Sequence, residues 1–268
     1  MLNLEGLPGI SLQSLSIYLL LLMLASLRVG AFLISSPFFG SRMVPLTVRI
    51  VFSIALGLGL VSQLKFPDLA TIVGPQLVPI IFQELFIGLT CGLVLSICFA
   101  SVILAGEKIA ATSGLAFAAQ IDPVSGAQSP VISQIFQLFL LILFFSLNGH
   151  LIIFEMIYKS FSIVPIGGFY NVNDVLEKAI SSSNTIYSNA VIIVLPIVSI
   201  LFFMNLGIGF ITKSAPQLNL FSFGFPLTIL GTFFALYFSV DALQYVFSGL
   251  IDDAIGFVKD ILMEGSNG

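Results

Sequence analysis

The stretch that decides the fold is Ile186–Ile211, IYSNAVIIVLPIVSILFFMNLGIGFI, which carries no charged residue. It exceeds the ~20 apolar residues that a helix needs to cross the hydrocarbon core of a bilayer. In lipid a chain must satisfy its own backbone groups, and no apolar run here alternates like a barrel strand, so such runs are predicted to be helices. Five further runs, the second of them short, have the same character: Leu12–Ile34, Ile50–Leu64, Leu77–Leu104, Val131–Phe154 and Leu218–Val240.

The composition of the whole chain also indicates a membrane protein. Apolar residues make up 58% of it and charged residues only 8%, whereas about a quarter of a typical soluble domain is charged. The mean hydropathy is +1.13. The formal net charge of -4, without a basic run, argues against a nucleic-acid partner. We therefore predict an all-α membrane protein, a single integral-membrane domain over residues 1–268, with Leu12–Ile34 kept as its first span.

Small residues and prolines predict bent, closely packed helices. Gly88 and Gly92 form a GxxxG pattern that lets another helix approach. Pro196 and Pro226 are expected to kink the fifth and sixth runs, which favours bent helical hairpins. The apolar stripe of the tail, Ile251 to Leu262, predicts a short surface helix. Lysines and arginines are almost evenly divided between the two sides, so partners are expected to help hold the chain in place.

The sequence offers little chemistry for an enzyme. It has one histidine, no metal-binding spacing of cysteines and histidines, and no glycine-rich phosphate loop, so no metal or cofactor is predicted. Ser113 with His150 loosely resembles the dyad of intramembrane serine proteases, but the flanking glycine pattern is missing. The favoured interpretation is that Asn148 and Gly149 end a helix there. Cys91 lies too far from Cys98 along one helix for a disulfide, and both are predicted to be small buried side chains.

Three ionisable residues fall within the apolar runs: Arg28, Glu84 and Asp241. Charge is costly in hydrocarbon, so such residues are candidates for an ion or proton relay. The sequence gives no rule for pairing them along one path. Structural ion pairing is therefore the favoured role for each, and the relay remains the alternative.

The segment Gly106–Pro123 is too apolar for a free aqueous loop and too broken for a span. Irregular backbone at membrane depth is tolerated only where it is buried in protein or lines a cavity. Composition alone favours a simple re-entrant or surface loop over one that lines a conduit.

Several motifs resemble the FliR family of flagellar type III export-gate proteins. The most specific is Ser214–Pro226, SAPQLNLFSFGFP, and Val164–Gly168, VPIGG, is another. Their order and spacing agree over nearly the whole chain. The residues that carry the family motif, and that we predict to matter for assembly, are Gly106, Glu107, Asp122, Pro123, Asn148, Gly149, His150, Pro216, Gln217, Asn219, Gly224 and Pro226.

The resemblance implies a structural channel subunit rather than an enzyme. Members of the family assemble as a single copy with several copies of FliP and FliQ into a cone-like gate in the bacterial inner membrane, within the flagellar basal body. The gate opens to FlhB, and unfolded flagellar proteins pass through its axis. A loop of this subunit plugs the closed channel, and by motif position it falls here on Ala111, Thr112, Ser113, Gly114, Leu115, Ala116, Phe117 and Ala118.

Two other functions remain open at this point. The first is the homologous export-gate subunit of a virulence injectisome, although the Gly-Phe-Pro that ends at Pro226 looks more flagellar. The second, of a different class, is a secondary transporter of a small solute. A transporter predicts an internal repeat and a polar site at the midplane, and the sequence has no clear repeat.

Overall fold

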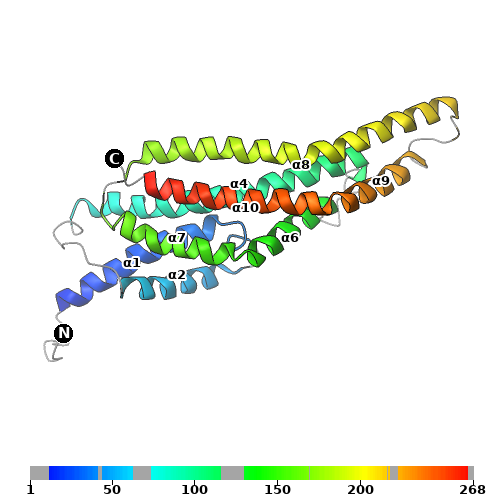
Figure 1. Cartoon of the computed structure of the whole chain (residues 1–268). Coiled ribbons are helices and arrows are strands. Elements are labelled where there is room, and N and C mark those ends of the chain that lie inside the picture. The colour runs from blue at the N-terminus through cyan, green and yellow to red at the C-terminus, as the bar shows by residue number, and fades with distance from the viewer. Residues whose placement is uncertain are drawn as a thin grey trace. The chain divides into compact units, whose positions relative to one another are not determined.

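The computed structural model describes residues 12–41, 44–62, 74–115, 130–168, 170–215, 217 and 223–264. These residues form helices and short connections without a strand (Figure 1), which confirms the all-α prediction. The helices are α1 (Leu12–Ser35), α2 (Leu46–Val61), α4 (Leu77–Ser113), α6 (Val131–Ser146), α7 (Gly149–Ile163), α8 (Val172–Ser214), α9 (Phe225–Phe238) and α10 (Val240–Glu264).

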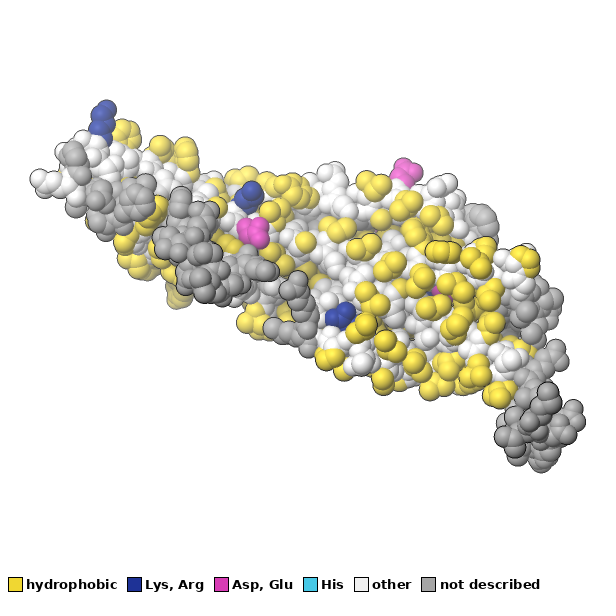
Figure 2. Space-filling model, turned by 180° about the vertical axis from the view of Figure 1, so that it is seen from behind, with side chains coloured by type: hydrophobic (Ala, Val, Ile, Leu, Met, Phe, Trp, Pro, Cys, Tyr) yellow, Lys and Arg dark blue, Asp and Glu magenta, His cyan; other side chains and the backbone are white. Residues whose placement is uncertain are grey.

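The helices of the described residues fit a membrane by length and composition. Segments of α1, α4 and α8 are each long and apolar enough to cross. Two further pairs, α6–α7 and α9–α10, pass the same test together but bend by 64° and 65° at a short break. By length and composition the described residues therefore contain three candidate spans, or up to five if each bent pair counts as one. On the face shown in Figure 2, hydrophobic side chains spread widely and charged ones are few. Such a surface suits lipid or apolar protein.

The chain divides into two compact units. The first unit comprises residues 1–96, 151–181 and 255–268, and the second comprises residues 97–150 and 182–254. The long helices α4, α8 and α10 each contribute to both units. A single domain over residues 1–268 stays a prediction.

In the first unit, α1 packs closely on α4 at two glycines. A Cβ atom on Gly88 would lie 2.8 Å from the Cβ of Ala31, and one on Gly92 would lie 2.8 Å from the carbonyl oxygen of Phe32. Real Cβ contacts are not this short, so only glycine allows the two backbones to come this close. The Phe154 ring of α7 packs against the rings of Phe32, Phe39 and Phe52 beside this contact.

In the second unit, aromatic side chains join the helices. The ring centroids of Phe136 on α6 and Phe247 on α10 lie 5.6 Å apart, and those of Phe99 on α4 and Phe144 on α6 lie 6.1 Å apart. Both cysteines are buried and free, as predicted, Cys91 in the first unit and Cys98 in the second.

Three local predictions were wrong. Gly106 does not open a loop, because α4 continues to Ser113. Pro226 does not kink a helix: it lies in the first turn of α9, where proline loses no hydrogen bond, and the bend comes at Ser239. Helix α8 continues through Pro196 to Ser214, so the proline does not end the helix, and the kink expected there stays a prediction. The tail is not a separate surface helix, because α10 runs unbroken to Glu264 and buries the stripe of Ile251, Val258 and Leu262.

Candidate functional site

The end of α4 lies where the predicted plug begins. Ser113 is the last residue of the helix, and Gly114 follows with a φ of 84°. This left-handed conformation favours glycine, which has no side chain to clash. A Cβ atom on Gly114 would lie 2.5 Å from Cδ1 of Phe225, in the first turn of α9. The local structure at Gly114 therefore requires glycine for both its backbone conformation and its packing.

Two side chains bind the last carbonyl groups of α4. The hydroxyl of Thr228 on α9 donates to the carbonyl of Ser113 at 2.9 Å, with both residues buried. The amide of Asn205 on α8 donates to the carbonyl of Thr112 at 3.2 Å. The final carbonyl groups of a helix have no partner within it, so these bonds satisfy groups that would otherwise be orphaned. We call Ser113, Gly114, Phe225 and Thr228 the loop root.

The bond from Thr228 competes with bonds inside its own helix. The same hydroxyl oxygen lies 3.2 Å from the carbonyl of Gly224 and 3.0 Å from that of Phe225. A hydroxyl carries a single proton, so it cannot donate fully to all three acceptors. The hydroxyl can thus exchange its bond to Ser113 for one within α9, and the cost of that exchange is the loss of a partner for the Ser113 carbonyl.

The chain returns to α4 at the start of α6. Pro130 precedes α6, and a Cβ atom on Gly106 would lie 2.6 Å from the Cα of Ser133 in the first turn of that helix. Gly106 is therefore required for a close contact between the two helices that flank the predicted plug. The predicted plug residues Ala116, Phe117 and Ala118 and the motif residues Asp122 and Pro123 lie outside the described residues.

A buried ion pair joins the helices of the first unit. The Nε of Arg28 on α1 lies 2.6 Å from one carboxylate oxygen of Glu84 on α4, and a second guanidinium nitrogen lies 2.9 Å from the other oxygen. The guanidinium also donates to the hydroxyl of Ser160 and the carbonyl of Val164, and it lies 4.0 Å from the ring centroid of Phe161. We call these five residues the Arg28 cluster. Its geometry shows Arg28 and Glu84 in a structural ion pair, the role favoured for each, although the sequence did not indicate that they pair with one another.

The VPIGG motif forms the turn that follows α7. Its first carbonyl, at Val164, binds Arg28, and its last, at Gly168, accepts a hydrogen bond of 2.9 Å from the amide of Gln83 on α4. Gly167 has a φ of 77°, the conformation that favours glycine. These bonds hold the connection between α7 and α8 against α1 and α4.

Tyr170 follows this turn and is buried. Its ring packs against that of Phe86, with centroids 6.3 Å apart, and its hydroxyl has no hydrogen-bond partner among the described residues. Burial raises the pKa of this hydroxyl because the charged form would lose its hydration. The hydroxyl is therefore protonated at physiological pH.

The motif Asn148-Gly149-His150 separates α6 from α7. Asn148 has a φ of 56°, and a Cβ atom on Gly149 would lie 2.6 Å from the ring of Phe144. The His150 ring packs at an angle of 50° against that of Phe145, with centroids 4.8 Å apart, and its Nδ1 has no hydrogen-bond partner among the described residues. The Ser113 hydroxyl donates instead to the carbonyl of Ala110 within its own helix. The protease interpretation of Ser113 with His150 thus has no geometric support.

The other predicted motif residues take simpler positions. Gly224 precedes α9 and Pro226 lies in its first turn. Glu107 is half-exposed on α4 and Gln217 is exposed, while Pro216 and Asn219 lie outside the described residues. Within the part of the chain that the structure describes, no group of three or more His, Cys, Asp or Glu side chains could hold a metal ion.

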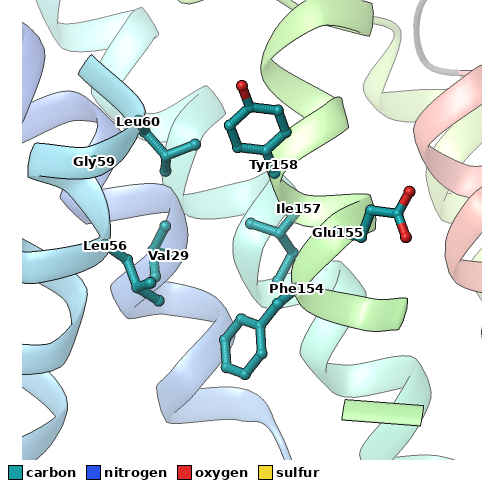
Figure 3. A pocket seen from close by; sticks show the side chains of 8 residues that line it. All are labelled: Val29, Leu56, Gly59, Leu60, Phe154, Glu155, Ile157 and Tyr158. Carbon is teal, nitrogen blue, oxygen red and sulfur yellow. The ribbon is translucent and has the colours of Figure 1, made fainter. Parts of the chain in front are cut away.

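A largely apolar pocket of about 380 Å³ lies in the first unit between α1, α2 and α7. Figure 3 shows Val29, Leu56 and Leu60 on one side of it and Ile157 on the other, while the carboxylate of Glu155 points away from them. Few polar groups converge there, so the pocket lacks the arrangement that catalysis on a polar substrate needs.

Comparison with known proteins identifies the family. Residues 19–254 match the family described as bacterial export proteins, family 1. The chain is also 31% identical to the flagellar biosynthetic protein FliR of Escherichia coli strain K12 over 203 residues, which cover 76% of this chain and 77% of that protein. This chain belongs to the FliR family of bacterial export proteins. It is a component of a bacterial export apparatus and is embedded in a membrane.

Two other relatives show the breadth of the FliR family. FliR of Bacillus subtilis strain 168 is 31% identical over 245 residues, which cover 90% of this chain and 93% of that protein. The surface presentation of antigens protein SpaR of Shigella flexneri is 24% identical over 225 residues, covering 84% of this chain and 87% of that protein.

Sequence reasoning did not find the partners of the motif residues. Thr228, Asn205 and Ser133 lie on other helices than the residues that they contact. Their common signal is a polar side chain within an apolar run, where an unpaired polar group is costly. That signal marks a residue that needs a partner, but it does not identify the partner.

Proposed function

We propose that this chain is a structural subunit of the flagellar type III protein export gate, which assembles with FliP and FliQ and plugs the conduit for unfolded flagellar proteins. In this proposal a single copy lies in the bacterial inner membrane within the flagellar basal body, and FlhB contacts the assembled gate. The family membership supports the export role.

The observation that carries the plug proposal is the loop root. Gly114 ends α4 against Phe225, and Thr228 binds the carbonyl of Ser113, so the following residues leave from a defined point inside the second unit. A plug needs one end that stays fixed while its tip leaves the conduit. Small side chains such as Ala116 and Ala118 suit close packing, Phe117 supplies bulk, and Gly114 supplies the turn.

Exposed apolar side chains support assembly with other subunits. In the apolar 18-residue window of the candidate span Tyr187–Ser214, only 22% is buried within the chain, and Phe203 and Phe210 on this span are 70% and 71% exposed. Large apolar surfaces of this kind occur where a protein meets lipid or another subunit.

Deletion of Ala116–Ala119 tests the plug. It leaves the loop root intact, because Ser113, Gly114 and Thr228 are unchanged. We expect the assembled complex to conduct ions in the absence of export substrate, measured as conductance in a planar bilayer and as ion leak in cells. Deletion of Lys65–Asp68, an equal length from the connection between α2 and α4, is the matched control.

Unchanged conductance in the Ala116–Ala119 deletion, with FliP and FliQ still co-purifying, would refute the plug role. If FliP and FliQ do not co-purify with the wild-type chain, the proposed assembly is refuted. The likeness to SpaR makes an injectisome subunit the second candidate. Restoration of motility in a flagellar fliR deletion strain, and not of effector secretion in an injectisome mutant, distinguishes the two.

A further inference from the structure

A second pocket of the first unit carries charged groups at its edge. It lies between α7 and the end of α10 and has a volume of about 390 Å³. Met156, Ile163 and Leu262 contribute apolar walls, and Glu155, Lys159 and Lys259 contribute charges. Figure 3 shows the Glu155 carboxylate on the side of α7 away from Leu56 and Leu60. The pocket therefore combines apolar walls with a net positive charge.

The two ammonium groups are available to a ligand. Lys159 pairs with Glu155 at 2.6 Å, but their side chains are 64% and 60% exposed. An ion pair this exposed contributes little, so Lys159 can exchange its partner readily. Lys259 is exposed and forms no ion pair with a described residue. The carboxylates of Asp252, Asp253 and Asp260 on α10 do not line the pocket.

We propose that this pocket binds the headgroup of an anionic phospholipid. The phosphate would accept hydrogen bonds from Lys159 and Lys259, and the glycerol and the first acyl carbons would contact Met156, Ile163 and Leu262. Basic pockets between membrane helices are suited to such headgroups, because lysine stems lie along apolar surface while their ammonium groups reach the polar layer. Methionine adapts its shape to a flexible ligand.

The charge and shape of the pocket favour a lipid over an acidic segment of a protein partner. A carboxylate side chain would use the two lysines but not the apolar walls beside them. A phospholipid uses both and is present wherever the chain is embedded. This inference depends on the membrane location and not on the plug, so either can fail without the other.

Native mass spectrometry of the full-length chain in detergent tests the proposal. The probes are phosphatidylglycerol and phosphatidylcholine with identical acyl chains, titrated separately. We expect tighter binding of phosphatidylglycerol, and a loss of about fivefold in its affinity for each of Lys159→Gln and Lys259→Gln. Lys213→Gln, an exposed lysine in the last turn of α8 that does not line the pocket, is the matched control and should keep wild-type affinity.

A variant with higher lipid affinity provides a second test, because misfolding can lower the affinity for lipid but does not raise it. Glu155→Gln removes the carboxylate that competes for Lys159, so phosphatidylglycerol should bind more tightly. Equal affinity for the two lipids, or an equal loss in Lys213→Gln, would overturn the proposal. So would a Lys159→Gln/Lys259→Gln variant that keeps its lipid affinity but loses partner subunits on extraction from cells, because the pocket would then be a protein-docking site.

Discussion

The Arg28 cluster and the loop root hold helices together by different means. In the Arg28 cluster, a buried guanidinium binds both oxygens of Glu84, a hydroxyl and a backbone carbonyl. In the loop root, one hydroxyl binds the carbonyl of Ser113 and has two competing acceptors within its own helix. Charged, multiply bonded contacts resist change, whereas a single neutral bond that can be exchanged resists little.

This difference indicates at which of the two contacts a change of conformation would cost less free energy. Separating Arg28 from Glu84 would leave two charges buried, which is costly. Separating Thr228 from Ser113 would leave the hydroxyl bonded within α9 and one carbonyl to be satisfied. The contact between Arg28 and Glu84 is thus costly to break, whereas the hydrogen bond from Thr228 to Ser113 costs less to exchange. The close packing of Gly114 against Phe225 still keeps this end of the proposed plug in place.

The largest effect is expected from Arg28→Met. It leaves Glu84 buried without its cation, and breaking such a pair costs roughly 3–5 kcal/mol. The free energy of unfolding of the purified chain, or its abundance in membranes, measures the loss. The double variant Arg28→Met/Glu84→Met should recover most of it, because no buried charge remains. If the double variant is as unstable as the single one, the ion pair is not the source of the stability.

A smaller effect is expected from Gly114→Ala. The φ of 84° strains any residue with a Cβ, and the added methyl group meets Phe225, so a loss of about 1–3 kcal/mol is expected. Thermal unfolding in detergent measures it, and conductance of the assembled complex should rise. Gly209→Ala is the control, because Gly209 is helical and a Cβ there meets no atom within 4 Å. An equal loss in both variants would contradict the role of the loop root.

Thr228→Val should cost about 0.5–1.5 kcal/mol, the usual net value of one hydrogen bond. Thr232→Val is a closely matched control: Thr232 is buried one turn further along α9, and its hydroxyl donates to the carbonyl of Thr228 within the same helix. Chemical unfolding should show the larger loss for Thr228→Val. Equal losses would mean that the bond to Ser113 adds nothing to stability.

The smallest effect is expected from Tyr170→Phe, which should leave stability unchanged or slightly raised. The hydroxyl has no partner among the described residues, so its removal relieves a desolvated polar group. Because burial raises the pKa of Tyr170, the folded and unfolded states are both protonated below about pH 10. The wild type would lose stability from this group only above that pH, so the variant should match it at pH 6 and at pH 9. A clear loss at both would reveal a partner for the hydroxyl.

Helix positions could be predicted from sequence because a long apolar run indicates a segment surrounded by lipid or apolar protein, and such a segment must form a helix. The run Leu12–Ile34 matches α1 almost residue for residue. Helix breaks were predicted less well, because a proline has different effects at different positions. Pro226 begins a helix, and α8 continues through Pro196, whereas the bend after α9 comes at Ser239, which no sequence signal marked.

The Arg28 cluster was half predictable. Burying a charged side chain in hydrocarbon is costly, so the positions of Arg28 and Glu84 within apolar runs indicated that both need partners. Ser160 and the carbonyl of Val164 could not be predicted, because they come from a helix and a turn more than 130 residues further along the chain. The loop root contains the predicted plug residues Ser113 and Gly114, but their partner Thr228 depends on how α9 packs against α4.

The contact between Gly106 and Ser133 has a consequence for evolution of the intervening segment. Helix packing places Gly106, about two turns before the end of α4, against Ser133 in the first turn of α6. The helices that flank the segment are therefore held together by contacts outside it. Doubling the length of a flexible loop then adds only about 0.6 kcal/mol. Relatives could therefore vary the size of this segment without rebuilding the helices on either side.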